Sequence, residues 1–370
     1  MPVVVIDRSV PQAQAYLSSR YDLAAEVNWD HRFVVEISGF YLATEDIEKL
    51  QRGFSDSVLI KKNDSSAWIL YYGLLSQFND FCLKFSVITG QNSLPLSNAV
   101  QNYFDGIKFS PRDLPGIMGI VNVTPDSFSD GGKYFQYQDA VLHAEKLISE
   151  GATMIDVGGE STRPGSQSVS TEEEFSRVIP VIRTIARKYP EITVSVDTTK
   201  SSVADAAFQE GAAIVNDISG GTFDPKMLSV CKKHKKPIII MHTSGTPAVM
   251  QHYTGYSDVV ADIITWLSST AEKAIKAGVA VFSIDPGIGF GKTVKDNYTL
   301  IARLREFSSL GYPILIGLSR KSFIGHALNL ETGERDNPTM TLEFAAMLKG
   351  VNYVRTHNVR NAVMAKELYK

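Results

Sequence analysis

Residues 120–132 have the sequence IVNVTPDSFSDGG, and this segment decides the fold of everything that follows it. It continues an apolar run that begins at Ile117 and ends at Val121. An asparagine, a Thr-Pro pair, two acids and then serine and glycine follow. In parallel barrels, the active-site residues lie in the loops that follow the buried strands, at one end of the barrel. The segment therefore predicts a first barrel strand followed by a functional loop.

Apolar runs of this kind recur after Gly116, with helical patterns between them. The eight runs are 117–121, 154–157, 192–196, 213–215, 238–241, 281–284, 314–316 and 353–354. The helical patterns include 139–150, 171–188, 201–210, 257–277, 296–310 and 338–349. Eight strand-plus-helix units over about 250 residues are the signature of a parallel (β/α)8 TIM barrel. A doubly wound open sheet is the structural alternative, but the near-uniform units favour closure.

Helix ends are marked in the sequence as well. Ser170 and Glu173 have the spacing of a capping box at the start of a helix, and so do Thr171 and Glu174. Five predicted helices end on a glycine just before the next strand, the residue type of a left-handed C-cap. These glycines are Gly151, Gly211, Gly278, Gly311 and Gly350.

The first 112 residues follow a different pattern. Residues 33–37 and 68–72 are strand-like, and residues 45–53 between them are helical. We predict a small α/β N-terminal domain over residues 1–112 and the barrel over residues 113–370, joined by a proline-containing linker at 108–115. The N-terminal domain contains no catalytic constellation, and its role stays open.

Composition limits the classes of partner. The chain has 370 residues, with 37 basic against 40 acidic side chains and a net charge of -3. Because no basic stripe with interleaved aromatics is present, we expect no nucleic-acid partner. No apolar run reaches the roughly 18 residues of a membrane span, so we expect no membrane partner either. The two cysteines are far apart and lack metal-ligand spacing, and we predict a cytoplasmic protein.

Polar residues follow every predicted barrel strand. They include Asn122, Asp156, Asp197, Asn216-Asp217, His242, Asp285, Ser319-Arg320-Lys321-Ser322 and Arg355-Thr356-His357. One acid or amide at a strand end is often only a loop cap. Eight such positions converging on the rim where barrel enzymes place their active sites predict a functional site.

Charge divides this rim into two halves. Asn122, Arg163, Arg355 and His357 offer neutral and cationic donors from strands 1, 2 and 8, which suit phosphate oxygens and, through Asn122, a Mg²⁺ ion beside a diphosphate. Asp197, Asn216, Asp285 and Lys321 come from strands 3, 4, 6 and 7. They suit a flat heterocycle whose N–H groups donate hydrogen bonds to the buried carboxylates. Ser322, at a predicted helix start beside Arg320, offers an additional binding site for an anion.

The residues quoted above resemble the signature segments of the dihydropteroate synthases. Asn122–Gly132 and Asp156–Gly165 match the first two segments, and the motifs around Asp197, Asn216, His242, Asp285–Lys292, Ser319–Ser322 and Arg355–His357 match the later ones in order. The likeness covers about residues 114–370. It implies a folate-pathway transferase, of a family that sulfonamides target. The enzyme would join 4-aminobenzoate to (7,8-dihydropterin-6-yl)methyl diphosphate with Mg²⁺ as cofactor, and the resemblance implies a homodimer.

The resemblance also implies roles for individual residues. Asp197, Asn216, Asp285 and Lys321 would contact the pterin, and Asn122, Arg163, Arg355 and His357 would hold the diphosphate, with Asn122 on the metal. The aminobenzoate would lie against Thr162, Pro164, Phe290, Arg320 and Ser322. Asp197, Lys321 and Asn122 would be the catalytic residues, with Asp197 stabilising a pterin cation after diphosphate leaves. The loops 124–132 and 161–165 would close to exclude water.

Two alternatives stay open at this point. A pterin-binding methyltransferase of the corrinoid type shares the barrel and the acidic pocket, but should lack the loop at 124–132 and the anion-binding site at 319–322. A non-catalytic pterin-binding paralogue should have lost loop residues. The sequence departs from many relatives at Asn358 and Thr243 and, more substantially, in residues 1–112.

Overall fold

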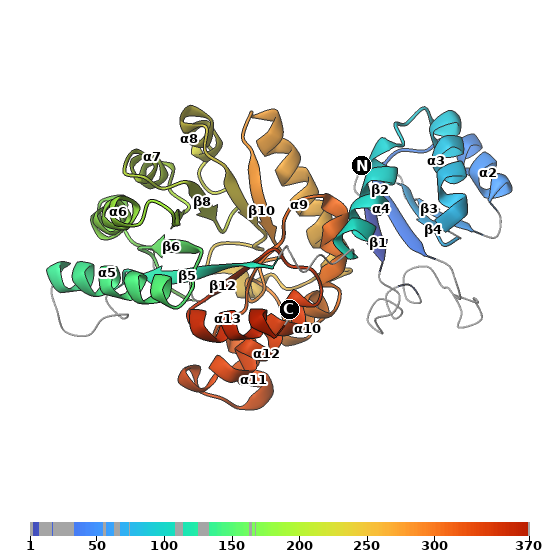
Figure 1. Cartoon of the computed structure of the whole chain (residues 1–370). Coiled ribbons are helices and arrows are strands. Elements are labelled where there is room, and N and C mark those ends of the chain that lie inside the picture. Colours follow the sequence, from blue (N-terminus) through green and yellow to red (C-terminus); the bar gives the residue numbers. More distant parts are fainter. Residues whose placement is uncertain are drawn as a thin grey trace. The chain divides into compact units, whose positions relative to one another are not determined.

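The computed structural model describes residues 3–6, 17, 33–54, 57–62, 67–73, 75–107, 114–124, 133–162, 165–166 and 168–368. The chain divides into two compact units (Figure 1). One contains Met1–Phe109, Ser257–Ser268 and Ala302–Gly311, and the other contains the remaining residues. The domain boundary at residue 112 stays a prediction, and residues 108–113 of the expected linker lie outside the described residues.

The N-terminal part contains an antiparallel sheet of four strands in the order β1-β2-β4-β3. The strands are β1 (Val3–Ile6), β2 (Val34–Phe40), β3 (Val58–Lys62) and β4 (Ala67–Tyr71), and the helices are α2 (Thr44–Gly53), α3 (Leu75–Thr89) and α4 (Leu94–Ile107). The two predicted strands and the predicted helix are confirmed as β2, β4 and α2. The sequence pattern missed α3 because apolar residues stand on its exposed side too, with Leu83 67% and Val87 83% exposed.

The second part is a parallel barrel. Its strands are β5 (Gly116–Asn122), β6 (Met154–Gly158), β7 (Thr193–Asp197), β8 (Ile214–Asp217), β9 (Ile238–Met241), β10 (Val281–Asp285), β11 (Leu315–Gly317) and β12 (Tyr353–Thr356). They form one sheet in the order β10-β9-β8-β7-β6-β5-β12-β11. A parallel bridge between Ile284 and Ile314 joins the two end strands. The predicted (β/α)8 barrel is therefore confirmed, and an open doubly wound sheet is excluded.

Helices cover the outside of this barrel (Figure 1). They are α5 (Lys133–Ser149), α6 (Thr171–Lys188), α7 (Ser201–Gln209), α8 (Met227–His234), α10 (Val294–Ala302), α11 (Ser322–Leu328), α12 (Asp336–Met347) and α13 (Val359–Glu367), with 3-10 turns η2 (Met250–His252) and η4 (Thr332–Glu334). The helix α9 (Val259–Lys276) is divided between the two units, and the 3-10 turn η3 (Leu304–Leu310) belongs to the first. The prediction of one helix over 296–310 is wrong, because α10 stops at Ala302 and η3 follows. Arg303 bonds to Glu306 three residues later, and a 3-10 turn places such side chains on one side.

The predicted helix ends are largely confirmed. The Ser170 hydroxyl accepts a hydrogen bond from the Glu173 backbone N–H at 3.1 Å, but the Glu173 carboxylate pairs with Arg177 instead of completing a capping box. All five predicted C-cap glycines have positive φ angles, between 73° and 109°. An added Cβ at Gly211 would lie 2.6 Å from the Ala186 Cβ, so this position tolerates no side chain.

The two cysteines, Cys82 and Cys231, are buried and unpaired. Among the described residues, no helix has both the length and the apolar character needed to cross a bilayer.

The buried carboxyl of Glu343 in α12 should make the stability of the protein depend on pH. The Glu343 side chain is 1% exposed, and burial raises the pKa of its carboxyl to about 8. In the unfolded chain this carboxyl ionises near its ordinary pKa of 4.5, so the folded protein loses stability as pH rises from there to about 8. We expect Glu343→Gln to gain stability relative to the wild type by about 1.4 kcal/mol per pH unit across this window, and no more above it. Urea unfolding of both proteins at pH 5, 6.5, 8 and 9 measures this, and parallel curves would contradict it.

Candidate active site

Strand register brings the predicted polar residues to one level at the barrel rim. Asn122 lies beside Gly158, Gly158 beside Asp197, and Asp197 beside Asn216 in the parallel pairs of β5 to β8. A side chain at Gly158 would occupy the space next to Asp197, since an added Cβ would lie 3.4 Å from the Asp197 Cβ. The glycine therefore keeps this space open. The structure therefore places the predicted residues of strands 1, 3 and 4 around one opening.

Arg355 connects the two halves of the rim. Its Nε donates to Asp156 Oδ2 and its Nη2 donates to Asp197 Oδ2, each at 2.7 Å. The Asn216 amide donates to the same Asp156 oxygen at 2.9 Å. The third guanidinium nitrogen, Nη1, has no hydrogen-bond partner in the described part of the chain. Arg355 was predicted to belong to the diphosphate half, and the structure places it against the acid of the pterin half as well.

Asp156 is a site residue to which the sequence assigned no role. It is completely buried, and its Oδ1 has no hydrogen-bond partner among the described residues. It was noted as a polar residue at a strand end, but its position one layer below the rim gave no reason to select it. A carboxylate at that depth needs Arg355 and Asn216 as donors.

Asp197 has an unusual proton affinity. Burial raises the pKa of its carboxyl to about 7, although the Arg355 guanidinium opposes the rise. Three neighbouring carboxylates add to it, from Asp156, Glu174 and Asp217. Ligand N–H donors or a developing positive charge would favour the ionised form.

Asp285 and Lys321 influence each other electrostatically. Asp285 Oδ1 accepts a hydrogen bond from the Gly287 backbone N–H at 2.7 Å. Burial raises the pKa of Asp285 and lowers that of Lys321 to about 8, and each charge opposes the shift of the other. The Lys321 ammonium donates to the Ile288 carbonyl and lies 4.7 Å from the centre of the Phe290 ring. The predicted pterin residues and the predicted aminobenzoate residue Phe290 are therefore contiguous.

A second buried lysine supports the same loop. Lys292 is 4% exposed, and its ammonium lies 3.1 Å from His242 Nδ1 and 2.8 Å from the Phe290 carbonyl. Burial lowers the pKa of Lys292 to about 7, which the charge of Asp285 opposes. In the sequence Lys292 stands out only as the last residue of the Asp285–Lys292 segment, and nothing there predicts its contact with His242.

Gly287 makes the Asp285–Lys292 loop possible. Its φ is +68°, and an added Cβ would lie 1.8 Å from the His242 carbonyl oxygen. We expect Gly287→Ala to lose about 3 kcal/mol of unfolding free energy and to displace Phe290 and Lys321. Gly333→Ala is the matched control, because nothing lies within 4 Å of a Cβ there. Equal stability of the two variants in urea unfolding would contradict the close approach.

The cationic side of the rim is centred on His357. Its Nε2 lies 3.5 Å from the Asn122 amide nitrogen, and its Nδ1 lies 3.0 Å from the Ser319 hydroxyl. The Ser319 hydroxyl also accepts from the His357 backbone N–H at 3.1 Å, which fixes the ring beside β5. The structure thus brings together Asn122 and His357 as predicted, while Arg163 lies outside the described residues.

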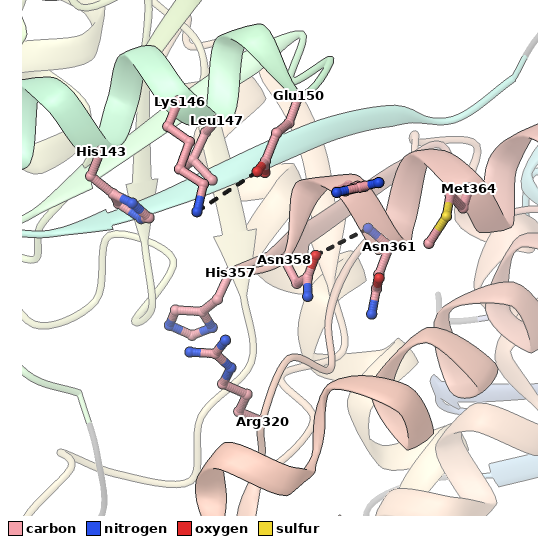
Figure 2. A pocket seen from close by; sticks show the side chains of 10 residues that line it. His143, Lys146, Leu147, Glu150, Arg320, His357, Asn358, Asn361 and Met364 are labelled. Atoms are coloured by element: carbon pink, nitrogen blue, oxygen red, sulfur yellow. Dashed lines mark hydrogen bonds and ion pairs between the residues drawn. The ribbon is translucent and has the colours of Figure 1, made fainter.

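Arg320 pairs with an acid of α12 and not with any of the strand-end carboxylates. Its guanidinium binds both oxygens of Asp336, at 2.6 and 2.9 Å, and its φ is +57°. It lines a cavity of about 520 Å³ together with His357 and with His143 and Lys146 of α5. Figure 2 shows the Arg320 guanidinium and the His357 ring among the side chains that line this cavity. Its predicted contact with aminobenzoate stays a prediction.

The remaining predicted residues are placed in part. Thr162 lines a second cavity, of about 630 Å³, together with Asp197 and Lys200. Ser322 is exposed at the first position of α11, as predicted. Pro164 and residues 125–132 of the predicted lid lie outside the described residues, and Thr124 is 8% exposed.

The geometry defines a class of protein. It is a barrel enzyme whose rim joins buried carboxylates, an amide and an ammonium, which suit a nitrogen heterocycle, to a cationic corner that suits an anion. The model of the family described as "Pterin binding enzyme" matches residues 118–357. The chain belongs to this family of pterin-binding enzymes and, within it, to the dihydropteroate synthases.

Individual relatives support this placement. The Bacillus subtilis dihydropteroate synthase is 48% identical over 75% of this chain and 94% of the relative. The Escherichia coli K12 dihydropteroate synthase is 44% identical over 68% of this chain and 89% of the relative. The Xanthomonas albilineans dihydropteroate synthase with 4-aminobenzoic acid superposes with a TM-score of 0.66 at 40% identity, over 70% of this chain and 92% of that one. These matches do not favour the methyltransferase or the non-catalytic alternative.

Proposed function

We propose that this chain condenses (7,8-dihydropterin-6-yl)methyl diphosphate with 4-aminobenzoate to give 7,8-dihydropteroate and diphosphate. The observation that carries this proposal is the network in which Arg355 binds Asp156 and Asp197 while Asn216 binds Asp156. It holds two carboxylates at the base of a rim that also has a cationic corner. Relatives whose structures contain 4-aminobenzoic acid or 7,8-dihydropteroate are consistent with these two ligands.

The pterin ring would lie among Asp197, Asn216, Asp285 and Lys321. Its N–H groups would donate to the two carboxylates, and the Lys321 ammonium and the Asn216 amide would donate to its ring acceptors. Such donors replace the water that the buried carboxylates have lost, so recognition of the ring also offsets their desolvation.

The diphosphate would bind at the cationic corner. Asn122, His357 and the Nη1 of Arg355 would donate to it, with Arg163 added from its loop. Among the described residues, no group of three or more histidine, cysteine, aspartate or glutamate side chains is placed to hold a metal ion. A Mg²⁺ ion fits here in another way, held by the Asn122 amide oxygen and by the diphosphate itself, as is usual for this cation. When bound, it would neutralise charge on the leaving group.

The aminobenzoate would lie against Phe290 beside Lys321, with Thr162, Pro164, Arg320 and Ser322 around it. Ser322 begins α11, whose backbone N–H groups favour a carboxylate. The neutral amine needs positioning more than activation, because the electrophile is a cation.

Catalysis in this proposal rests on Asp197. Loss of diphosphate leaves positive charge on the pterin, and a fixed carboxylate beside the ring stabilises that charge without reorganising. Asn122 stabilises the departing anion, and Lys321 orients the ring. The loops at 124–132 and 161–165 would exclude the water that otherwise captures the cation.

Incubation of the purified protein with pterin diphosphate and 4-aminobenzoate tests the activity. We expect 7,8-dihydropteroate by mass spectrometry, one diphosphate for each product, and dependence on Mg²⁺. Absence of product with both substrates and the metal would refute the proposal. Transfer of a methyl group from a reduced folate under the same conditions would favour the methyltransferase alternative.

We also propose a cytoplasmic homodimer. Light scattering of the full chain measures the mass of the assembly. Residues 1–112 lie outside the matched family model.

A further inference from the structure

An ion cluster lies beside Asp197 and takes no part in the proposed chemistry. The Lys200 ammonium binds Glu160 and, at 2.5 Å, Glu174. Lys200 stands three residues after Asp197 and is the N-cap residue of α7. Its backbone is held in place, because its own N–H donates to the Thr198 hydroxyl at 3.1 Å and the next N–H donates to Asp224 at 2.8 Å.

Glu174 needs this lysine. Its side chain is 1% exposed, and its Oε1 has no hydrogen-bond partner among the described residues. A buried carboxylate without a cation costs several kcal/mol. Burial alone would lower the pKa of Lys200, but the bonds to Glu160 and Glu174 outweigh it and raise the pKa. Lys200 therefore stays charged and offsets Glu174.

Through its bond to Glu160, the same lysine also contacts the segment that leads to Thr162. Arg177 donates to the Gly159 carbonyl at 2.7 Å, Lys200 binds Glu160, and the Gly165 N–H donates to the Pro247 carbonyl at 3.1 Å. Thr162 lies between these attachments and lines the 630 Å³ cavity together with Asp197, Glu160, Glu174 and Lys200. Gly159, Glu160 and Gly165 are thus each held by a contact with another part of the chain, and the contact made by Lys200 also neutralises a buried acid.

The cluster also acts on Asp197 through its charge. The groups that face Asp197 electrostatically are Arg355 of β12, Asp156 of β6, Glu174 of α6 and Asp217 of β8. Glu174 is one of the three carboxylates that make ionisation of Asp197 harder. A cation paired with Glu174 weakens that effect.

We propose that Lys200 is a positioning residue for this site. It holds Glu160, and with it the segment 160–162, so that aminobenzoate can bind against Thr162, and it offsets Glu174 so that Asp197 stays ionised during turnover. This inference rests on the proposed synthase activity.

Lys200→Met tests both roles. At pH 8.5, where Asp197 is ionised, we expect the KM for 4-aminobenzoate to rise about tenfold, which is 1.4 kcal/mol, while the Kd for pterin diphosphate stays within twofold. In the profile of kcat/KM for pterin diphosphate, the acid limb reports Asp197 in the free enzyme. We expect this limb to move to higher pH by about one unit. Lys200→Arg should restore both values.

Two further variants separate the roles. Glu160→Gln should raise the KM for aminobenzoate without moving the acid limb. Lys200→Met combined with Glu174→Gln removes the buried acid together with its cation. The acid limb of kcat/KM should then return to its wild-type pH, while the KM for aminobenzoate stays high. This double variant and Glu160→Gln also keep the proposal testable if Lys200→Met alone does not fold.

Lys188→Met is the matched control, because Lys188 pairs with Glu145 on the exposed side of α6. We expect it to leave both values unchanged. An aminobenzoate KM within twofold of the wild type in Lys200→Met, or an acid limb that fails to return in the double variant, would overturn the inference. A wild-type protein that makes no dihydropteroate would instead refute the proposed function.

Discussion

Replacing Asp197 by asparagine is expected to lower kcat by about 10²- to 10³-fold while the protein stays folded. Asparagine keeps the shape and one acceptor oxygen but removes the charge, so the pterin ring still finds part of its contact. The developing positive charge then lacks its closest fixed anion. The binding of diphosphate-free pterin, measured by calorimetry, should weaken much less than kcat falls.

The pH profile of the wild type gives an independent readout of the same residue. Because the pKa of Asp197 in the free protein is about 7, kcat/KM for pterin diphosphate should rise with pH through this value. In the asparagine variant this limb should disappear. Asp205→Asn on the surface of α7, where Asp205 pairs with Lys233, is the control and should change neither rate nor profile. Turnover of Asp197→Asn within tenfold of the wild type would remove the cation-stabilising role.

The barrel could be predicted from sequence because its signals are local. Each strand of the barrel is a short apolar run that ends in a polar residue, and each glycine cap is a single-residue requirement. Asn122, Asp197 and Asn216 could be assigned to one rim because parallel strands in register place their ends at one level. The N-terminal helix α3 gave no such periodic signal.

The pairings within the site could not be predicted in this way. Whether the Arg355 side chain turns toward the diphosphate corner or toward Asp197 depends on its rotamer and on the buried charge of Asp156, which lies 199 residues away in sequence. The contact between Lys200 and Glu174 has the same origin, since only the burial of Glu174 reveals that it needs a cation. Sequence spacing shows which residues reach the rim, and the local dielectric environment decides which of them pair.

Replacing Arg355 by methionine is expected to cost about 3 kcal/mol of unfolding free energy at pH 8, in addition to lost activity. Methionine fills much of the same volume but leaves Asp156 and Asp197 without their shared cation. We expect the lower end of the range for broken buried pairs, because 20% of the Arg355 side chain is exposed. Arg183→Met is the matched control, since Arg183 binds Glu210 through two nitrogens on the surface and should lose less than about 1 kcal/mol.

The pH dependence of this loss distinguishes charge from packing. Arg355 opposes the rise in the pKa of Asp197, so its removal raises that pKa further above 7. A carboxyl with a raised pKa in the folded state loses stability as pH increases through that value. The deficit of Arg355→Met should therefore be smaller at pH 5.5, where Asp197 carries a proton, than at pH 8. Urea unfolding at the two pH values measures this difference, and a deficit independent of pH would show that Arg355 acts by packing alone, without a charge contribution to Asp197.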